Sequence, residues 1–319
     1  MPAPRTDHFL VQWSRWRTAA RRAETPGPAG MARIDTPQGS LRVVDSRTPG
    51  PCIVITPNVI EHHALLLAAL ASDFRVVCFD MPGFGMSWPA RTYRHTLDEG
   101  AAAVLQVLDA LRIRQATLAF SSANGLYALR AARMAPERIA GLVLAQTPSL
   151  DVMQDWAHRT VPPVLRWPVA GQLAGWLLRR RAADSWYRRA VARLSDPAPF
   201  QRTAARAFAC GGCFGLAGVV QGLLGADAAP LEGVTAPCTV LWGGADRSHR
   251  AASADSLARL VPHARMVRAD ASGHFPDLEA PEAYLRLVRE HMAGPTHRAA
   301  LAARPATANA ALAEGVDPA

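Results

Sequence analysis

Short apolar runs alternate with amphipathic stretches along most of the chain. The apolar runs occupy residues 52–55, 75–79, 116–120, 139–145 and 239–242. Amphipathic stretches with helical spacing separate most of them, at residues 62–71, 97–111 and 123–134. Because continuous apolar strands that alternate with amphipathic helices form parallel sheets covered on both faces, the pattern predicts an α/β fold with a mostly parallel sheet.

Further elements of both kinds lie on either side of this series. Strand-like runs at residues 31–35 and 40–45 flank a turn and precede the series. After residue 242 the pattern continues with a helix, a strand and a second helix, at residues 252–260, 264–269 and 281–292.

The alternation is interrupted between residues 147 and 235, where the spacing is helical and Trp and Arg are frequent. We therefore predict a core of residues 31–146 and 236–294 with a helical lid at residues 147–235. Residues 1–30 form an N-terminal segment rich in Arg and Trp. Residues 295–319 are rich in Ala and Pro and have no apolar face, so we predict a disordered tail.

Charge and composition exclude several functions. All 35 basic residues are Arg, so Schiff-base chemistry and a phosphate-loop lysine are excluded. The net charge is +9, but no basic block is interleaved with aromatic residues as a nucleic-acid groove requires, and we expect no nucleic-acid partner.

The five cysteines and the apolar stretches bear on location. An odd number of cysteines in apolar surroundings favours free buried thiols in the cytoplasm, including the Cys210 and Cys213 pair. Arg side chains interrupt the N-terminal segment, which therefore does not resemble a signal peptide. Residues 207–226 are uncharged and long enough to span a bilayer, but their six glycines favour a lid element over membrane insertion.

Three segments carry candidate chemistry. In residues 116–125 a strand runs directly into a helix, with Ser121 and Ser122 at the junction, which is the geometry of a nucleophile elbow. Asp246 follows the next apolar strand after the lid, and His274 follows the strand after that. The chain order Ser, Asp, His matches one of the common triad architectures.

With these segments in order, the chain resembles the α/β-hydrolase superfamily, in the lidded branch of esterases, carbon–carbon bond hydrolases, epoxide hydrolases and haloperoxidases. The motifs that carry the resemblance are Asp80-x-Pro-Gly-x-Gly-x-Ser87, Pro136-Glu-Arg-Ile-x-Gly-Leu-Val-Leu144, Trp242-Gly-x-x-Asp246 and Gly273-His-x-x-x-Leu-Glu-x-Pro-Glu282. The resemblance implies the α/β-hydrolase fold and a Ser122–His274–Asp246 triad. It also makes Ser122 the nucleophile from its separation to Pro136, although Ser121 has the smaller flanking residues.

Two positions depart from the family pattern. Phe120 and Asn124 stand where the elbow usually has glycine, and Pro57 stands where the oxyanion loop usually has glycine. Proline has no N–H to donate, so the resemblance assigns the oxyanion hole to Asn58 and to the backbone N–H of Ala123. The adjacent residues Glu61, His62 and His63 point in different directions from a helix start, and we expect no metal site and no cofactor.

These observations predict a cytoplasmic serine hydrolase that transfers the acyl group of a small lipophilic ester. A thioesterase, a lyase or a perhydrolase-type enzyme on the same site is an alternative, as is a ligand-binding homologue with weak catalysis. The lid arginines also suit a carboxylate or a carrier protein as partner.

Overall fold

The computed structural model describes residues 9–10, 13, 30–56, 59–249 and 252–302, and in this part of the chain nine strands form a single sheet. The strands lie in the order β1-β2-β4-β3-β6-β7-β8-β9, and β5 pairs with β2. The pairs β1–β2, β2–β4 and β2–β5 are antiparallel and all others are parallel. The strands are β1 Met31–Thr36, β2 Gly39–Asp45, β3 Cys52–Thr56, β4 Arg75–Phe79, β5 Trp88–Pro89, β6 Ala116–Ser121, β7 Ile139–Ala145, β8 Cys238–Gly243 and β9 Arg265–Ala269.

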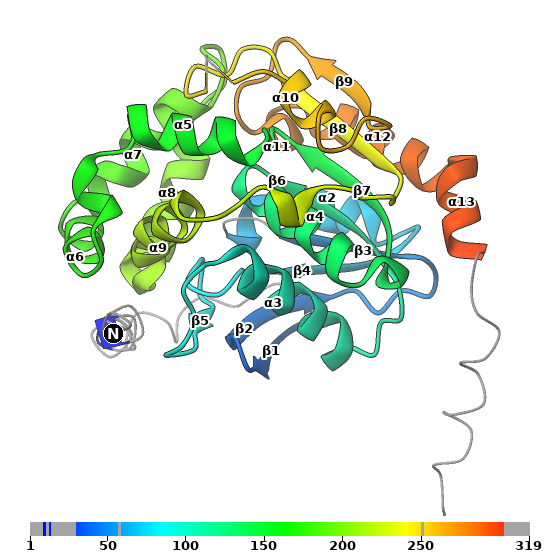
Figure 1. Ribbon diagram of the computed structural model, residues 1–319, viewed down its shortest axis with the longest axis horizontal. Helices are drawn as coiled ribbons and strands as arrows, with labels where there is room; N and C mark the ends of the chain where they lie inside the picture. The colour runs from blue at the N-terminus through cyan, green and yellow to red at the C-terminus, as the bar shows by residue number, and fades with distance from the viewer. Residues whose placement is uncertain (1–8, 11–12, 14–29, 57–58, 250–251, 303–319) are drawn as a thin grey trace, which may run out of the picture.

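Helices cover both faces of this sheet (Figure 1). Successive strand residues point to opposite faces, so Ile53 and Ile55 pack with α2 and α12 while Cys52 and Val54 pack with α3 and α4. The helices outside the lid are η1 Ile60–His63, α2 Ala64–Leu70, α3 Leu97–Ala110, α4 Ala123–Met134, η2 Pro136–Arg138, α10 Asp255–Ala258, α11 Pro276–Glu279, α12 Pro281–Ala293 and α13 Pro295–Ala302.

Between β7 and β8 every regular element of the described chain is a helix. Its helices α5 to α9 gather at one end of the sheet, on the left in Figure 1. They are α5 Leu150–Thr160, η3 Pro163–Arg166, α6 Ala170–Leu177, α7 Arg179–Ala190, α8 Ala198–Ala207, η4 Phe208–Gly212, α9 Cys213–Leu224 and η5 Ala229–Leu231. We refer to residues 147–235 as the lid.

One helical stretch of the described chain, Ala198–Leu224, is long and apolar enough to cross a membrane. It is broken at Gly211, whose φ of 103° is not helical. On either side of the break, Phe208 and Phe214 pack into an apolar cluster with Tyr187 of α7. The stretch is therefore part of the packed lid.

The tail prediction is wrong for its first part. Residues Pro295–Ala302 form α13, in which His297 is 1% exposed. His297 Nδ1 donates to Met292 O at 3.1 Å, and Nε2 accepts from Thr117 Oγ1 at 2.7 Å. A polar contact with a central strand holds this helix, so its sequence needs no apolar face. Residues 303–319 lie outside the described chain.

Smaller differences have local causes. The helix expected at residues 252–260 is only α10, because Ser253 Oγ accepts from the Asp255 N–H in a local turn just before it. Most of the N-terminal segment lies outside the described residues. Trp13 of this segment is described, and it packs edge-on against Trp176 of the lid, with 5.3 Å between ring centroids.

Candidate active site

Ser122 occupies a strained turn between β6 and α4. Its φ of 53° and ψ of −132° are rare for a residue with a side chain. The turn is held because Ser122 N–H donates to Ala145 O at 2.8 Å, and Thr147 Oγ1 donates to Ser122 O at 3.1 Å. Such strain persists only where the surrounding contacts enforce it, and here it turns the Ser122 side chain away from the sheet.

The two unusual flanking residues fit this elbow. Phe120 is 1% exposed and packs into the core on the α3 and α4 side of the sheet. Asn124 Nδ2 donates to Thr56 O at 3.0 Å, which ties the elbow to the end of β3. The crowded position is Gly125, where a Cβ atom would lie 2.1 Å from Thr147 Oγ1. Glycine is therefore required at position 125, one residue after the position where the elbow of the family usually has it.

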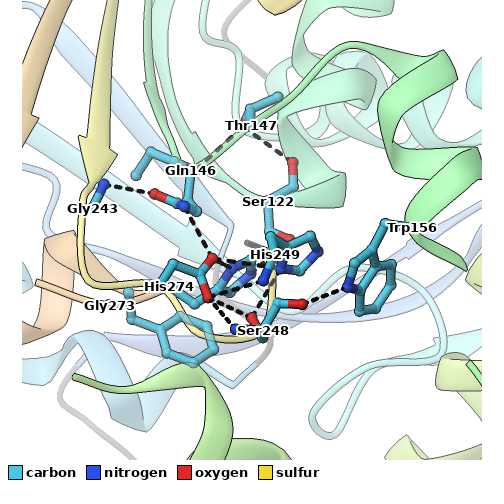
Figure 2. A network of polar contacts seen from close by, with 12 residues as sticks. Ser122, Gln146, Thr147, Trp156, Gly243, Ser248, His249, Gly273 and His274 are labelled. Carbon is cyan, nitrogen blue, oxygen red and sulfur yellow. Dashed lines mark hydrogen bonds and ion pairs between the residues drawn. The ribbon is translucent and has the colours of Figure 1, made fainter. Parts of the chain in front are cut away.

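The structure brings Ser122, His274 and Asp246 together. Figure 2 shows Ser122 and His274 side by side. Ser122 Oγ lies 3.0 Å from His274 Nε2, and His274 Nδ1 lies 2.8 Å from Asp246 Oδ2. Ser121 is the last residue of β6 and pairs with Ala145, so the register favours Ser122.

The lid helps to place His274. The backbone N–H of His274 donates to Ala190 O, at the end of α7, at 2.7 Å. Gly273 approaches the same carbonyl so closely that a Cβ atom would lie 2.3 Å from it. Glu279 accepts from Gly273 N–H at 2.9 Å and from the lid's Ala192 N–H at 2.8 Å. One carboxylate thus joins the histidine loop to the lid.

Asp246 is surrounded by donors. Besides His274, its oxygens accept from Gln146 Nε2 at 2.9 Å and from Ser248 Oγ at 2.6 Å. Burial alone would raise the pKa of Asp246, but its contacts with His249, His274 and Ser248 hold the pKa of that carboxyl well below its ordinary value. Asp246 is therefore an anion able to stabilise a protonated His274.

The expected oxyanion hole is described only in part. Asn58 and Pro57 lie outside the described residues. Ala123 is the first residue of α4, so its N–H has no acceptor within the helix, and it lines the same cavity as Ser122. The positive end of the α4 dipole also faces this point.

An ion cluster lies at the start of η1. Arg42 donates to Glu61 at 2.6 and 2.9 Å and to Asp80 Oδ2 at 2.7 Å. Asp80 Oδ1 accepts from Ile60 N–H at 2.9 Å, and its Oδ2 accepts from Met86 N–H at 2.9 Å. The Asp80 motif therefore anchors Ile60, at the start of η1.

A cavity of about 390 Å³ opens between the elbow and the lid. Ser122, Ala123 and His249 line it on the core side, and most other lining residues are apolar side chains of the lid. Lid residues that line it include Met153, Trp156, Val161, Leu165, Leu178, Phe208, Leu216, Val219 and Leu223. The cavity suits a lipophilic molecule.

The model of the alpha/beta hydrolase family matches residues 60–287, which include the elbow, the lid and the Asp246 and His274 loops. The chain belongs to this family. It is a hydrolase with the α/β-hydrolase fold, as its sequence motifs predict.

Two curated relatives and one solved structure illustrate the likeness. The dihydrolipoyllysine-residue acetyltransferase component of the acetoin cleaving system of Pseudomonas putida is 43% identical over 82 residues, 26% of this chain and 22% of that protein. The 3-oxoadipate enol-lactonase 2 of Acinetobacter baylyi is 27% identical over 229 residues, 71% of this chain and 81% of that protein. The enol-lactonase of Burkholderia xenovorans LB400 shares the fold, with a TM-score of 0.65 and 22% identity over 82% of this chain and 100% of its own.

Sequence reasoning missed two polar residues of this hydrolase site. Gln146 follows β7 directly and bridges the Asp246 carboxylate and the Gly243 N–H, which donates to Gln146 Oε1 at 2.7 Å. His249 stacks on His274 with 4.4 Å between centroids and an interplanar angle of 14°. The only sequence signal for either is its place in the loop after a central parallel strand.

His62 and His63 have separate protein partners. His62 Nε2 donates to Phe200 O at 3.2 Å and His63 Nε2 to Asp277 at 2.8 Å, so the two rings serve different partners. Asp246, His249 and His274 offer ligand atoms within 4.8 Å of one another. However, the imidazole lone pairs lie in the ring planes, and two stacked parallel rings cannot direct them at one ion.

Proposed function

We propose that the protein is a serine hydrolase that cleaves an ester-like bond by acyl transfer. The observation that carries this proposal is the line of contacts from Ser122 Oγ through the His274 ring to Asp246 Oδ2. It resembles a nucleophile, a general base and an orienting anion in hydrogen-bond reach of one another.

The proposed first half-reaction forms an acyl enzyme. His274 Nε2 takes the Ser122 proton while Ser122 Oγ attacks the carbonyl carbon, and Asp246 stabilises the imidazolium through the Nδ1–H. The Ala123 N–H and Asn58 hold the oxyanion. His274 then returns the proton to the leaving oxygen, and water releases the acid in a second half-reaction.

A serine nucleophile favours acyl transfer over opening of an epoxide or displacement of a halide. Attack on an epoxide would leave an ether on Ser122, and water does not cleave ethers under the same catalysis. Attack on an ester or lactone leaves an ester, which water cleaves by the same steps. The relative from Acinetobacter baylyi is named as a lactonase, and a lactone is an internal ester.

The cavity lining supports a small lipophilic substrate. Arg181, Ser185 and Arg189 also line it, at helical spacing along one face of α7. Two guanidinium groups on this face suit a carboxylate on the substrate or the acidic surface of a carrier protein. The described cysteines are all free and buried, which supports a cytoplasmic location.

A fluorophosphonate probe tests the proposal. Intact-mass analysis should show one adduct on the protein, retained in Ser121→Ala and lost in Ser122→Ala. An adduct that persists in Ser122→Ala contradicts the assignment. A labelled enzyme that turns over thioesters much faster than matched oxygen esters would instead identify a thioesterase, and absence of labelling would favour a ligand-binding homologue.

A further inference from the structure

The cavity beside Ser122 has an unbalanced charge. Among the described residues that line it are two arginines, Arg181 and Arg189, and no aspartate or glutamate. Most of the other lining residues are aliphatic or aromatic. Two positive charges therefore border an apolar space that also contains the proposed nucleophile.

Both arginines stand on the solvent side of this cavity. They lie just over two turns apart on α7, and both are exposed, whereas Trp186 of the same helix is half-buried. Trp186 also lines the cavity, and its ring packs edge-on against the ring of His274 with 5.4 Å between centroids. One helix thus carries the two cations at the rim of the cavity and an aromatic ring beside the candidate triad.

Neither cation is neutralised by an acidic side chain of the described chain. Arg181 has no hydrogen bond or ion pair with a described residue, and Arg189 Nε donates to a backbone oxygen, Ser185 O, at 3.3 Å. Arg188 of the same helix does not line the cavity, and it pairs with Asp184. The guanidinium groups that border the cavity are therefore available to an anion that enters it.

The chemistry of guanidinium groups narrows the choice of anion and its position. They bind carboxylates through charge-assisted hydrogen bonds that are often bidentate. A carboxylate at the exposed rim keeps part of its hydration, whereas one placed among the apolar side chains would lose it without compensation. A molecule that fits this cavity therefore has an apolar body and carries its negative charge at one end.

We propose that Arg181 and Arg189 form a carboxylate subsite, and that the substrate is an ester with an apolar body and a carboxylate remote from the scissile bond. This inference rests on the proposed acyl-transfer function and specifies its substrate class. Arg181 lies five residues before Trp186, about 7.5 Å along the axis of α7. Several methylene groups therefore separate the carboxylate from the bond that Ser122 attacks.

Two pairs of esters test the subsite. The first pair is p-nitrophenyl octanoate and the mono-p-nitrophenyl ester of suberate, which have the same chain length and differ in the terminal carboxylate. The second pair places the carboxylate on the alcohol side, with hexyl acetate and the acetate ester of ω-hydroxyhexanoate. For each pair the specificity ratio is kcat/KM of the carboxylate ester divided by kcat/KM of the neutral ester.

In the unmodified protein we expect a specificity ratio above one in at least one pair. In the double variant Arg181→Gln/Arg189→Gln we expect that ratio to fall about threefold to tenfold, since charged hydrogen bonds at an exposed rim are lost. Added salt should lower the ratio of the unmodified protein in the same direction. Arg188→Gln is the matched control, because it removes one positive charge from the same helix outside the cavity and should leave the ratio unchanged.

Ratios below one for the unmodified protein in both pairs, or an unchanged ratio in the double variant, would overturn the subsite. An equal fall in Arg188→Gln would also overturn it, because the preference would then follow the net charge of the lid. Failure of Ser122 to acquire an acyl mass from either p-nitrophenyl ester would instead overturn the proposed function itself.

Discussion

The orientation of His274 depends on the two carboxylate oxygens of Asp246. Its two oxygens accept hydrogen bonds from His274, Gln146 and Ser248, so both oxygens must act as acceptors. An amide in its place would turn an N–H group toward at least one donor. The orientation of His274 then loses its support.

We expect Asp246→Asn to lower ester turnover about 10⁴-fold through this loss of orientation, with the fold intact. The readout is steady-state turnover together with circular dichroism. Asp151→Asn is the matched control, since Asp151 lies after β7 but pairs with Arg259 at 2.9 Å near the surface. Near-normal turnover in Asp246→Asn, or a large loss in Asp151→Asn, would place the acid elsewhere.

At this scale the sequence predicted the three side chains of the candidate triad, because each follows a strand in a motif of fixed length. It did not predict Gln146 or His249. Their contacts arise from the adjacency of β7 and β8 and from ring stacking, and no spacing within one segment encodes either. The sequence also did not predict the ion pair of Glu61 with Arg42, because the two residues lie on different elements.

At the scale of elements, the junction of β6 and α4 is tightly packed beside the site. Gly125 leaves no room for a Cβ atom beside Thr147, whose hydroxyl also donates to Ser122 O. Any added atom must push the first turn of α4 away from β7. That movement carries Ser122 and the Ala123 N–H with it.

Gly125→Ala should therefore lower the free energy of unfolding by about 1–3 kcal/mol, as overpacking does, and should also reduce turnover. Urea denaturation and steady-state kinetics measure the two effects. Gly225→Ala is the control, because nothing lies within 4 Å of its added Cβ, and we expect it to be nearly neutral. Similar stability losses in the two variants would show that the close contact with Thr147 is relieved without cost.

The helices and strands with long, regular hydrophobic patterns were predicted best. The strands β4 and β7 and the helix α4 have the predicted bounds. A long apolar or amphipathic run fits only one type of element, and the run marks where that element begins and ends. The two-residue strand β5 and the single-turn helix α11 were not predicted. Elements of this length exist through their neighbours: β5, for example, is defined by its pairing with Gly39 and Ser40 of β2.

At the scale of the molecule, α13 ties the end of the described chain to the sheet. Thr117, on the strand that leads to Ser122, is fully buried, and its hydroxyl donates to His297. The position of this helix could not be predicted from local sequence, since its main anchor is a residue 180 positions away.

We expect His297→Ala to lower the free energy of unfolding by about 1–3 kcal/mol, because it leaves the Thr117 hydroxyl buried without its partner. Arg298→Ala, at the exposed neighbouring position, should change stability by less than about 0.5 kcal/mol. Both are measured by urea denaturation. Indistinguishable midpoints for the two variants would mean that α13 contributes nothing to global stability.

The order of strands has a consequence for how such an enzyme changes over evolution. Thr56, Ser122, Gln146, Asp246 and His274 each end or follow a different strand, and their strands lie side by side as β3-β6-β7-β8-β9. Each of these residues is positioned by its own strand and loop. A mutation can therefore alter one loop while the sheet holds the other four residues in place. The departures in the loop after β3 and at the elbow are such local changes. The catalytic repertoire of this chain can therefore diversify one loop at a time.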